Sequence, residues 1–480
     1  MKAISVPLLR PRAAWLRRAV GAVGVAALAA CASAPPSPPA TSTTKAERGL
    51  DLIEAKGHAP IEAPPSPAKG RVLLSGATVW TAEGRKLSPG WVLVVDGRIA
   101  ELGEGPAPTG DARVVDLRGK VLTPGLIDVH SHLGVYPSPP ISATRDGNEA
   151  TSPNTAGVWV EHSFWAEDPA IERAVQGGVT TMQVLPGSAN LFGGRGVILH
   201  LRPMRGVRAM RFPGAPDTLK MACGENPKRV YGNRGGAPST RMGNVRGYRD
   251  AFAQAKRWLK DNRDKPADEV ARDLGMETLA GVLEGRILPE VHCYTVQDML
   301  DFLAVADEFG FQVRAFHHAL EAYKIRDILA KRQVGVATWA DWWGFKLEGW
   351  DGIEEAPALI AESGGRVAIH SDSSEGIQRL NQEAAKAMYA GKAAGIAVDE
   401  EDALRWVTAD AAWMLGIDGE VGTIAPGKRA DLVAWDKNPM SVYARAERVW
   451  IDGVEVLDRS DPKKPRAPWS DFELGLGGAR

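Results

Sequence analysis

The chain has 480 residues, and its 58 lysines and arginines nearly balance 59 aspartates and glutamates, which gives a formal net charge of −1. Apolar residues make up 44% of the chain and charged residues 24%. This composition is ordinary for a globular protein and excludes intrinsic disorder for most of the sequence. The near-neutral charge argues against a nucleic-acid-binding protein, which usually carries a basic excess. The length is sufficient for one domain of barrel size and a smaller second domain.

The first 30 residues have the pattern of an export signal, in which a basic start is followed by an apolar run over residues 19–30. This run is shorter than the roughly 20 residues that span a bilayer. It ends at Leu28-Ala29-Ala30-Cys31, which resembles the cleavage site of bacterial lipoproteins. The resemblance implies that Cys31 carries lipid and anchors the protein to a membrane. Ala32 favours outer-membrane sorting, with the protein facing the periplasm, and a plain secretory signal is the alternative.

The next segments divide by composition and periodicity. Residues 31–68 are rich in proline, serine and threonine, which predicts an extended tether. Residues 69–122 and 419–460 alternate apolar and polar positions, which predicts short antiparallel strands. We expect these two flanks to form one small β-sandwich, followed by a C-terminal tail over residues 461–480.

Between the flanks, over residues 123–418, apolar strand-like runs alternate with helical patterns. This alternation is typical of parallel βα units in an α/β protein. Eight such runs in about 300 residues predict a (β/α)8 TIM barrel with insertions. The third run could instead belong to a hairpin insertion. The runs begin near Leu126, Thr180, Val197, Leu219, Glu290, Gln312, Val334 and Arg366.

Ionisable residues stand at the ends of several runs, where a TIM barrel carries its chemistry. The first run ends in His130-Ser131-His132. Alternate residues of a strand share a face, so both histidines can bind one metal ion. Neutral imidazole is a good ligand for Zn²⁺ and similar ions. His292, His318 and Asp372 end later runs in the same way.

These strand-end residues are arranged as in the amidohydrolase superfamily, and the chain resembles its members over roughly residues 70–460. The closing motif of the superfamily is matched at residues 422–433. Residues 192–196, 224–231 and 318–324 are most similar to the imidazolonepropionase-like branch. The resemblance implies a barrel with a split sandwich. It also implies four metal ligands and a catalytic acid/base, namely His130, His132, His292, His318 and Asp372.

In superfamily members with two metal ions a further ligand bridges them, and two residues could do so here. Lys220, which would have to be carboxylated, stands near the start of its run, so we expect it toward the wrong end of the barrel. Glu225 follows the same run and is the favoured bridge. Without either bridge the site holds one metal. The implied cofactor is Zn²⁺, with Mn²⁺ or Fe²⁺ as alternatives.

This ligand set predicts a hydrolase of a C–N bond in an amide, a small peptide or a cyclic amide. The metal makes hydroxide available at neutral pH, and Asp372 moves the proton. The expected partners are a small-molecule substrate, a membrane through the lipid anchor, and a second copy of the chain in a homo-oligomer. Two alternatives are a deaminase of an aminated heterocycle and a non-catalytic binding lipoprotein on the same barrel.

Substrate contacts are predicted at five further positions. The candidates are Arg195, Arg241, Tyr323, Trp339 and His370. The two arginines could bind a substrate carboxylate, and His370 could equally face the barrel wall. Trp339 belongs to a cluster with Trp342, Trp343 and Trp350, which could line an aromatic pocket or pack a long loop.

Two further expectations concern residues near the predicted ligands. His317 is expected to point away from His318 and to be structural, with an exchange of their positions as ligand kept open. Cys223 and Cys293 could pair in an oxidising compartment, but we expect both to be buried small apolar residues.

Overall fold

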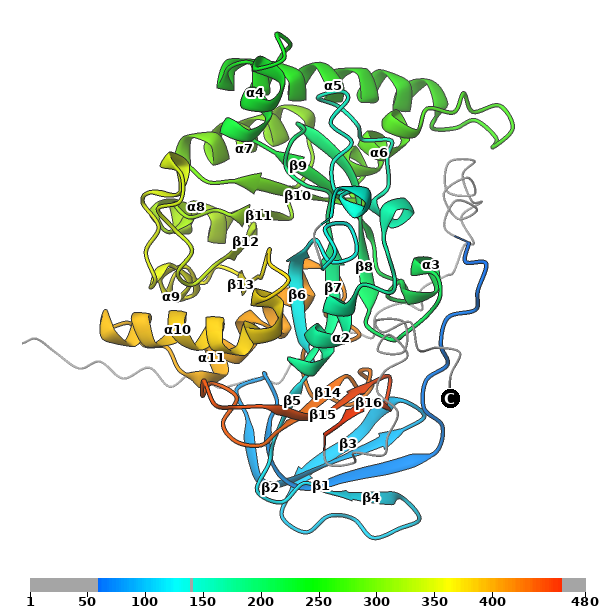
Figure 1. Cartoon of the computed structure of the whole chain (residues 1–480), viewed down its shortest axis with the longest axis vertical. Coiled ribbons are helices and arrows are strands. Elements are labelled where there is room, and N and C mark those ends of the chain that lie inside the picture. The colour runs from blue at the N-terminus through cyan, green and yellow to red at the C-terminus, as the bar shows by residue number, and fades with distance from the viewer. Residues whose placement is uncertain (1–58, 139–140, 460–480) are drawn as a thin grey trace, which may run out of the picture. The chain divides into compact units, whose positions relative to one another are not determined.

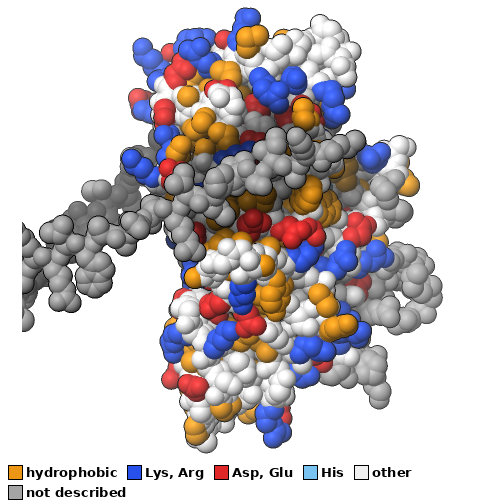
Figure 2. Space-filling model, turned by 90° about the vertical axis from the view of Figure 1, so that its left-hand side faces the viewer, with side chains coloured by type: hydrophobic (Ala, Val, Ile, Leu, Met, Phe, Trp, Pro, Cys, Tyr) orange, Lys and Arg blue, Asp and Glu red, His pale blue; other side chains and the backbone are white. Residues whose placement is uncertain are grey.

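The computed structural model describes residues 59–138 and 141–459. The predicted signal, Cys31, the first part of the tether and the C-terminal tail lie outside the described residues. Two eight-stranded sheets organise the described part (Figure 1). No helix found among these residues has the length and apolar character needed to cross a membrane. On the face drawn in Figure 2, acidic and basic side chains are interspersed, in agreement with the near-neutral composition.

One sheet forms the predicted barrel, with the strands in sequential order from β6 to β13. At its two ends the backbone N–H of Asp372, which follows β13, donates to the carbonyl of His130 in β6 over 3.0 Å. The ends of the sheet therefore meet beside the predicted ligands. The barrel strands are β6 (Leu126–Ser131), β7 (Val179–Val184), β8 (Phe192–His200), β9 (Asp217–Ala222), β10 (Ile287–Cys293), β11 (Ala315–His318), β12 (Gly335–Thr338) and β13 (Val367–Ile369).

The third strand, β8, differs from the expectation of eight parallel strands. It begins at Phe192, five residues before the predicted start, and pairs antiparallel with both β7 and β9. Only residues 185–191 separate β7 from β8. A parallel connection needs about a dozen residues or more, so this short link can only make a hairpin. The hairpin alternative for the third run is therefore the observed one.

Helices cover the outside of the barrel strands (Figure 1). Several begin with a side chain that accepts a hydrogen bond from a free N–H of the first turn, as Thr295 does at α7 and Asp399 at α11. The helices are α2 (Pro169–Gln176), α3 (Val207–Met210), α4 (Glu225–Gly232), α5 (Arg241–Asn262), α6 (Leu274–Leu283), α7 (Val296–Phe309), α8 (Arg326–Lys331), α9 (Ala356–Glu362), α10 (Leu380–Ala393), α11 (Glu400–Trp406) and α12 (Ala409–Met414). Short 3-10 turns are η1 (Ser142–Thr144), η2 (Val160–Ser163), η3 (Ala322–Ile325), η4 (Leu347–Gly349) and η5 (Gly376–Arg379).

The second sheet combines strands from both flanks, as predicted. Its strands are β1 (Arg71–Trp80), β2 (Lys86–Val95), β3 (Arg98–Glu104), β4 (Arg113–Asp116), β5 (Val121–Pro124), β14 (Leu432–Trp435), β15 (Ala446–Ile451) and β16 (Val454–Asp458). The two flanks join where β14 pairs antiparallel with β5. They therefore form one continuous hydrogen-bonded path rather than two unlinked sheets. Gly125 alone separates β5 from β6, and a Cβ there would lie 2.2 Å from the hydroxyl of Thr180.

A buried ion cluster links β8 to this second sheet. His200 ends β8, and its Nε2 lies 2.5 Å from Asp431, while its Nδ1 lies 3.4 Å from Asp452. Arg429 contacts Asp452 at 2.6 Å. Burial alone would lower the pKa of His200, but the two carboxylates raise it to about 9. Burial likewise opposes ionisation of Asp452, and the contact with His200 nevertheless lowers its pKa to about 2.

Alkaline pH should weaken folding through this cluster. The pKa of His200 is about 9 in the folded chain and about 6.5 when unfolded. Its contribution is therefore complete below pH 6.5 and is lost as the pH rises through 9. The difference corresponds to about 3 kcal/mol in the free energy of unfolding. We expect urea unfolding to give a lower free energy of unfolding at pH 10 than at pH 6.

The His200→Asn variant separates this contribution from other titrations. The gap in unfolding free energy between wild type and variant should shrink by about 3 kcal/mol from pH 6 to pH 10. A gap that stays constant over this range would contradict a charged His200.

Candidate metal centre

A pocket of about 360 Å³ opens at the carboxyl ends of the barrel strands. Five of the predicted metal-site residues and Asp372 line it together. The lining residues are His130, His132, Ser188, Lys220, Glu225, Asn226, Arg229, His292, Tyr294, His318, Phe345, Lys346 and Asp372. The topology explains this convergence, because side chains that end parallel strands meet at one end of a barrel.

His132 and Asp372 face each other in a way that calls for a cation. Nδ1 of His132 lies 2.7 Å from the carbonyl oxygen of Leu185, which can only accept, so this nitrogen carries the proton. Nε2 of a neutral His132 therefore presents a lone pair, and it lies 3.2 Å from Oδ1 of Asp372. Two acceptors at this distance repel unless a proton or a metal ion lies between them. Ligand atoms of His130, His132 and Asp372 all lie within 4.8 Å of one another.

His130 is held between buried groups on both sides of its ring. Its Nε2 lies 2.9 Å from Nζ of Lys220, and its Nδ1 lies 2.9 Å from Nδ1 of His317. Nε2 of His317 in turn lies 2.8 Å from Oε2 of Glu290. All four residues are at most 1% exposed. Because Nδ1 is engaged by His317, a metal could bind His130 only at Nε2, in place of the contact with the amine of Lys220.

Three more imidazoles carry unpaired nitrogens. Within the described residues, Nδ1 of His292, Nδ1 of His318 and both ring nitrogens of His370 are buried without a hydrogen-bond partner. Buried polar atoms are normally paired, so this donor set fits a bound cation. Burial lowers the pKa of His292 and of His318 well below the usual value, and that of His370 to about 3. All three rings are therefore neutral and keep their lone pairs.

His318 is also fixed by stacking. Its ring stacks on Trp339, at 4.4 Å and 21°, and on Tyr294, at 5.2 Å and 20°. The indole N–H of Trp339 donates to the carbonyl of Ser371. Trp339 is buried and is not among the pocket-lining residues, so it packs against a predicted ligand, and its contact with a substrate stays a prediction. Three tryptophans of the same loop are exposed, namely Trp342 (41%), Trp343 (50%) and Trp350 (66%), so loop packing does not account for them.

Three non-glycine residues at this site have a left-handed backbone. His318, Ala319 and Asp372 have φ values of 67°, 42° and 48°. This left-handed region is costly for a residue with a side chain, at about 1–3 kcal/mol each. Such strain persists where the fold needs a side chain to point in one direction, which is consistent with functional use of His318 and Asp372.

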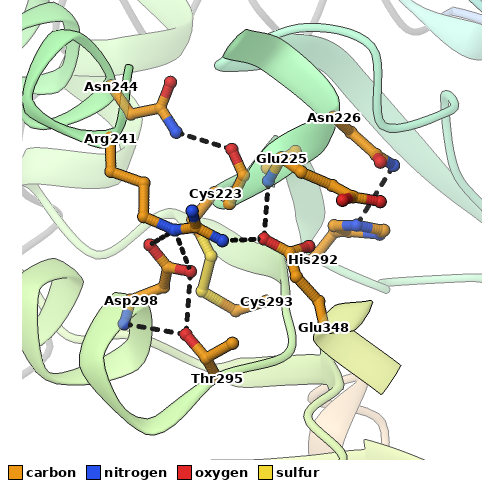
Figure 3. Close-up of a disulfide and its surroundings, with 12 residues drawn as sticks. Cys223, Glu225, Asn226, Arg241, Asn244, His292, Cys293, Thr295, Asp298 and Glu348 are labelled. Atoms are coloured by element: carbon orange, nitrogen blue, oxygen red, sulfur yellow. Dashed lines mark hydrogen bonds and ion pairs between the residues drawn. A yellow bond between two sulfur atoms is a disulfide. The ribbon is translucent and has the colours of Figure 1, made fainter. Parts of the chain in front are cut away.

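Both candidates for the bridge reach the pocket. The strand β9 begins at Asp217, two residues before the predicted start, so Lys220 lies in its second half and its amine reaches His130. The expectation that Lys220 lies toward the wrong end of the barrel is therefore wrong. Glu225 is the first residue of α4, and its carboxylate points to the side of His292 (Figure 3). Its Oε1 lies 3.6 Å from Nζ of Lys346.

The predicted arginine clamps are used within the fold instead. Arg195 is 2% exposed in β8, and its guanidinium contacts Asp217 at 2.7 Å. The guanidinium of Arg241 is bound by Asp298 and Glu348. Neither arginine lines the pocket, and neither does Tyr323, which lies in η3. The structure does not bring these three residues to the pocket lining, and their contact with a substrate stays a prediction.

Cys223 and Cys293 form a disulfide, with their Cα atoms 5.3 Å apart (Figure 3). The expectation of two separate apolar cysteines is therefore wrong, although both are buried. Cys223 follows β9 and Cys293 ends β10, directly after His292. The bond therefore joins the end of β9, which carries the two candidates for the metal bridge, to the end of β10, which carries the predicted ligand His292.

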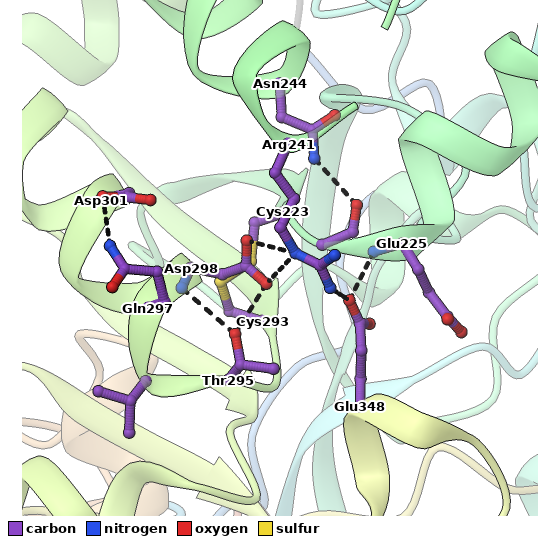
Figure 4. A network of polar contacts seen from close by, with 12 residues as sticks. Cys223, Glu225, Arg241, Asn244, Cys293, Thr295, Gln297, Asp298, Asp301 and Glu348 are labelled. Atoms are coloured by element: carbon purple, nitrogen blue, oxygen red, sulfur yellow. Dashed lines mark hydrogen bonds and ion pairs between the residues drawn. A yellow bond between two sulfur atoms is a disulfide. The ribbon is translucent and has the colours of Figure 1, made fainter. Parts of the chain in front are cut away.

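A polar network outside the disulfide holds the start of α4 (Figure 4). Glu348 accepts a hydrogen bond of 2.7 Å from the backbone N–H of Glu225 and also binds Arg241. Arg241 contacts Asp298 of α7 at 3.0 Å. Glu348, in the loop after β12, is thereby bound to the first residues of α4 and α5. These contacts fix the backbone of Glu225.

Two buried carboxylates at this site were not among the sequence predictions. Glu290 contacts His317, and Asp128 accepts from the backbone N–H groups of His130 and Ser371, each at 3.1 Å. Both stand two residues before a predicted ligand, in Asp128-Val129-His130 and Glu290-Val291-His292. A carboxylate inside an apolar run at this spacing is the signal that could have identified them, because residues two apart share a face.

Known proteins that are similar to this chain include amidohydrolases. A family model described as "Amidohydrolase family" matches residues 301–457. The structure of an amidohydrolase from Thermotoga maritima MSB8 is 38% identical, with a TM-score of 0.75, over 81% of this chain and all of that one. Amidohydrolase tasK of Hapsidospora irregularis is 34% identical over 82% of this chain, which spans only 44% of that relative.

The relatives also include other activities. The 5-methylthioadenosine/S-adenosylhomocysteine deaminase of Syntrophomonas wolfei is 26% identical over 76% of this chain and 84% of its own length. Imidazolonepropionases are among the relatives as well, in agreement with the branch resemblance of the sequence.

Removal of the disulfide should destabilise the protein. The bond closes a loop with a sequence separation of 70 residues, so its loss frees a large segment in the unfolded chain. We expect the Cys223→Ala/Cys293→Ala variant to lose about 2–4 kcal/mol of unfolding free energy, measured by urea unfolding. Wild type treated with a reductant should match the variant. Equal stability of wild type with and without reductant would contradict this expectation.

Proposed function

The chain belongs to the amidohydrolase superfamily and is a hydrolase of C–N bonds, and from this premise we propose that it acts on an amide, a small peptide or a cyclic amide. The observation that carries the proposal is the facing pair of His132 and Asp372, with His130 beside it, in a pocket open to a small molecule. This arrangement supplies a cation site and a proton acceptor at one point.

The residues that would hold the metal are His130, His132, His292 and His318, with Zn²⁺ as the proposed ion and Mn²⁺ or Fe²⁺ as alternatives. A divalent cation bound there lowers the pKa of water to about 7 and polarises a carbonyl oxygen. The neutral state of the buried rings supports this assignment, because only the unprotonated nitrogen can be a ligand.

Asp372 is the proposed general acid/base. Its carboxylate lines the pocket and is held by the backbone contact of its N–H with His130. In the proposed reaction Asp372 accepts a proton from the attacking water. It then donates this proton to the nitrogen that leaves, so one group acts as base and then as acid.

Lys220 is the proposed bridging ligand, as a carboxylated lysine. Its amine lies against Nε2 of His130 in the barrel interior, at 1% exposure, so a carboxylate carried on the same stem would supply oxygen ligands beside His130. Glu225 remains the second candidate, because it lines the pocket. Its carboxylate lies near the amine of Lys346, which competes for it.

A deaminase is the second candidate function, and the identity to a deaminase over most of this chain favours it. Deamination uses the same histidine and aspartate set on a C=N carbon and usually one metal. A non-catalytic binding protein would not need Asp372 opposite a ligand lone pair. The number of metal ions and the turnover of aminated heterocycles distinguish these functions.

We also propose that the protein is exported and lipid-anchored through Cys31. The disulfide between Cys223 and Cys293 supports an oxidising compartment, where such bonds persist.

Asp372→Asn should retain the metal and lose turnover. The amide preserves the shape of the side chain but cannot take up a proton, so kcat should fall by a factor of about 10²–10⁴. A screen of dipeptides, N-acyl amino acids, cyclic amides and aminated heterocycles supplies the substrate. Glu375→Gln, an exposed change in the same loop, is the matched control and should keep wild-type turnover. Normal kcat in Asp372→Asn would refute the proposed step.

Metal content should identify the bridge. If Lys220 bridges, Lys220→Ala should lose at least one equivalent of metal per chain after dialysis, measured by elemental analysis, while Glu225→Gln keeps both. The opposite result would assign the bridge to Glu225. Unchanged content in both variants would indicate a site without either bridge.

A further inference from the structure

Three buried side chains from three strands form a continuous row that ends at the metal site. Glu290 of β10, His317 of β11 and His130 of β6 are joined by contacts of 2.8 Å and 2.9 Å. The two rings are 4.8 Å apart between centroids and lie at 70° to each other. Each residue is at most 1% exposed, so water does not compete for these contacts.

The contact between two Nδ1 atoms restricts where the protons are. At 2.9 Å one Nδ1 must donate and the other must accept. If His130 donates, His317 accepts at Nδ1 and donates from Nε2 to the carboxylate of Glu290. If a neutral His317 donates from Nδ1, its Nε2 must accept a proton from a neutral Glu290. In this second arrangement the proton of neutral His130 stays on Nε2.

Only the first arrangement leaves a lone pair on the nitrogen of His130 that faces the pocket. We propose that Glu290 and His317 form a positioning relay, which holds His130 as the Nδ1–H tautomer and so directs its Nε2 lone pair to the metal. This inference rests on the proposed metal site. Neither relay residue touches substrate, and both act through His130. Such outer partners fix the tautomer and the ring orientation of a ligand and raise its basicity.

The relay also explains why two adjacent histidines have different functions. His317 uses both ring nitrogens, one for His130 and one for Glu290, so it has none left for a metal. His318 keeps Nδ1 without a partner among the described residues. His317 therefore supports the ligand His130, and His318 is free to be a metal ligand itself.

Nitrogen-15 NMR of the full chain, labelled at histidine and loaded with ¹¹³Cd²⁺, tests the relay directly. We expect coupling of ¹¹³Cd to Nε2 of His130 and a proton on its Nδ1, with the proton of His317 on Nε2. A proton on Nδ1 of His317, or a doubly protonated His317, would overturn the relay. Absence of cadmium coupling to every histidine would instead overturn the metal site and the proposed function.

Variants provide a second readout that does not depend on activity. Glu290→Leu should weaken metal binding by about 10–100-fold, measured by competition with a chelator. Glu290→Gln keeps an oxygen acceptor and should lose less. The control is Thr218→Val, which removes a buried hydrogen bond from Gln183 in the same barrel without touching the relay. Its metal affinity should equal that of wild type, and wild-type affinity in Glu290→Leu would contradict the proposal.

Discussion

The close approach of neutral imidazoles and carboxylates at one end of the barrel is the constraint on which the site depends. Burial lowers the pKa of His130 well below its usual value, so the ring provides a lone pair rather than a charge. Nε2 of His132 lies 3.2 Å from a carboxylate oxygen of Asp372. Such a cluster is unfavourable by itself and becomes favourable around a cation. The disulfide, the aromatic stack on His318 and the left-handed backbone of Asp372 all hold it in place.

The reversal of β8 connects this site to the other end of the barrel. Because β8 runs antiparallel to its neighbours, its first residues lie near the pocket end and its last residue, His200, reaches the second sheet. There the imidazole is charged and paired with Asp431, whereas burial favours the neutral form of His130, His292 and His318 in the pocket. Histidine thus serves as a structural cation at one end of the barrel and is the proposed metal ligand at the other, and the two environments differ in the number of carboxylates around the ring.

The sequence predicted those parts of the fold that depend on local periodicity. The alternation of strand and helix patterns located the barrel, and the spacing of two along a strand identified His130 and His132 as residues of one face. The direction of β8 depends on the length of the link before it. The predicted link was too long, because Gly193 and Gly194 are unusual at the start of a strand and β8 was expected to begin only at Val197. The disulfide depends on which strand ends are adjacent in space. Lys220 was misplaced because two residues at the start of its strand were assigned to the preceding loop.

We infer that the facing side chains of His132 and Asp372, together with His130, hold a divalent cation. Anomalous diffraction from crystals of the full chain loaded with Mn²⁺ is a direct test of this cation site. We expect an anomalous peak within coordination distance of Nε2 of His130 and of His132, next to the carboxylate of Asp372. No peak at this position, with a direct hydrogen bond between a doubly protonated His132 and Asp372, would contradict it.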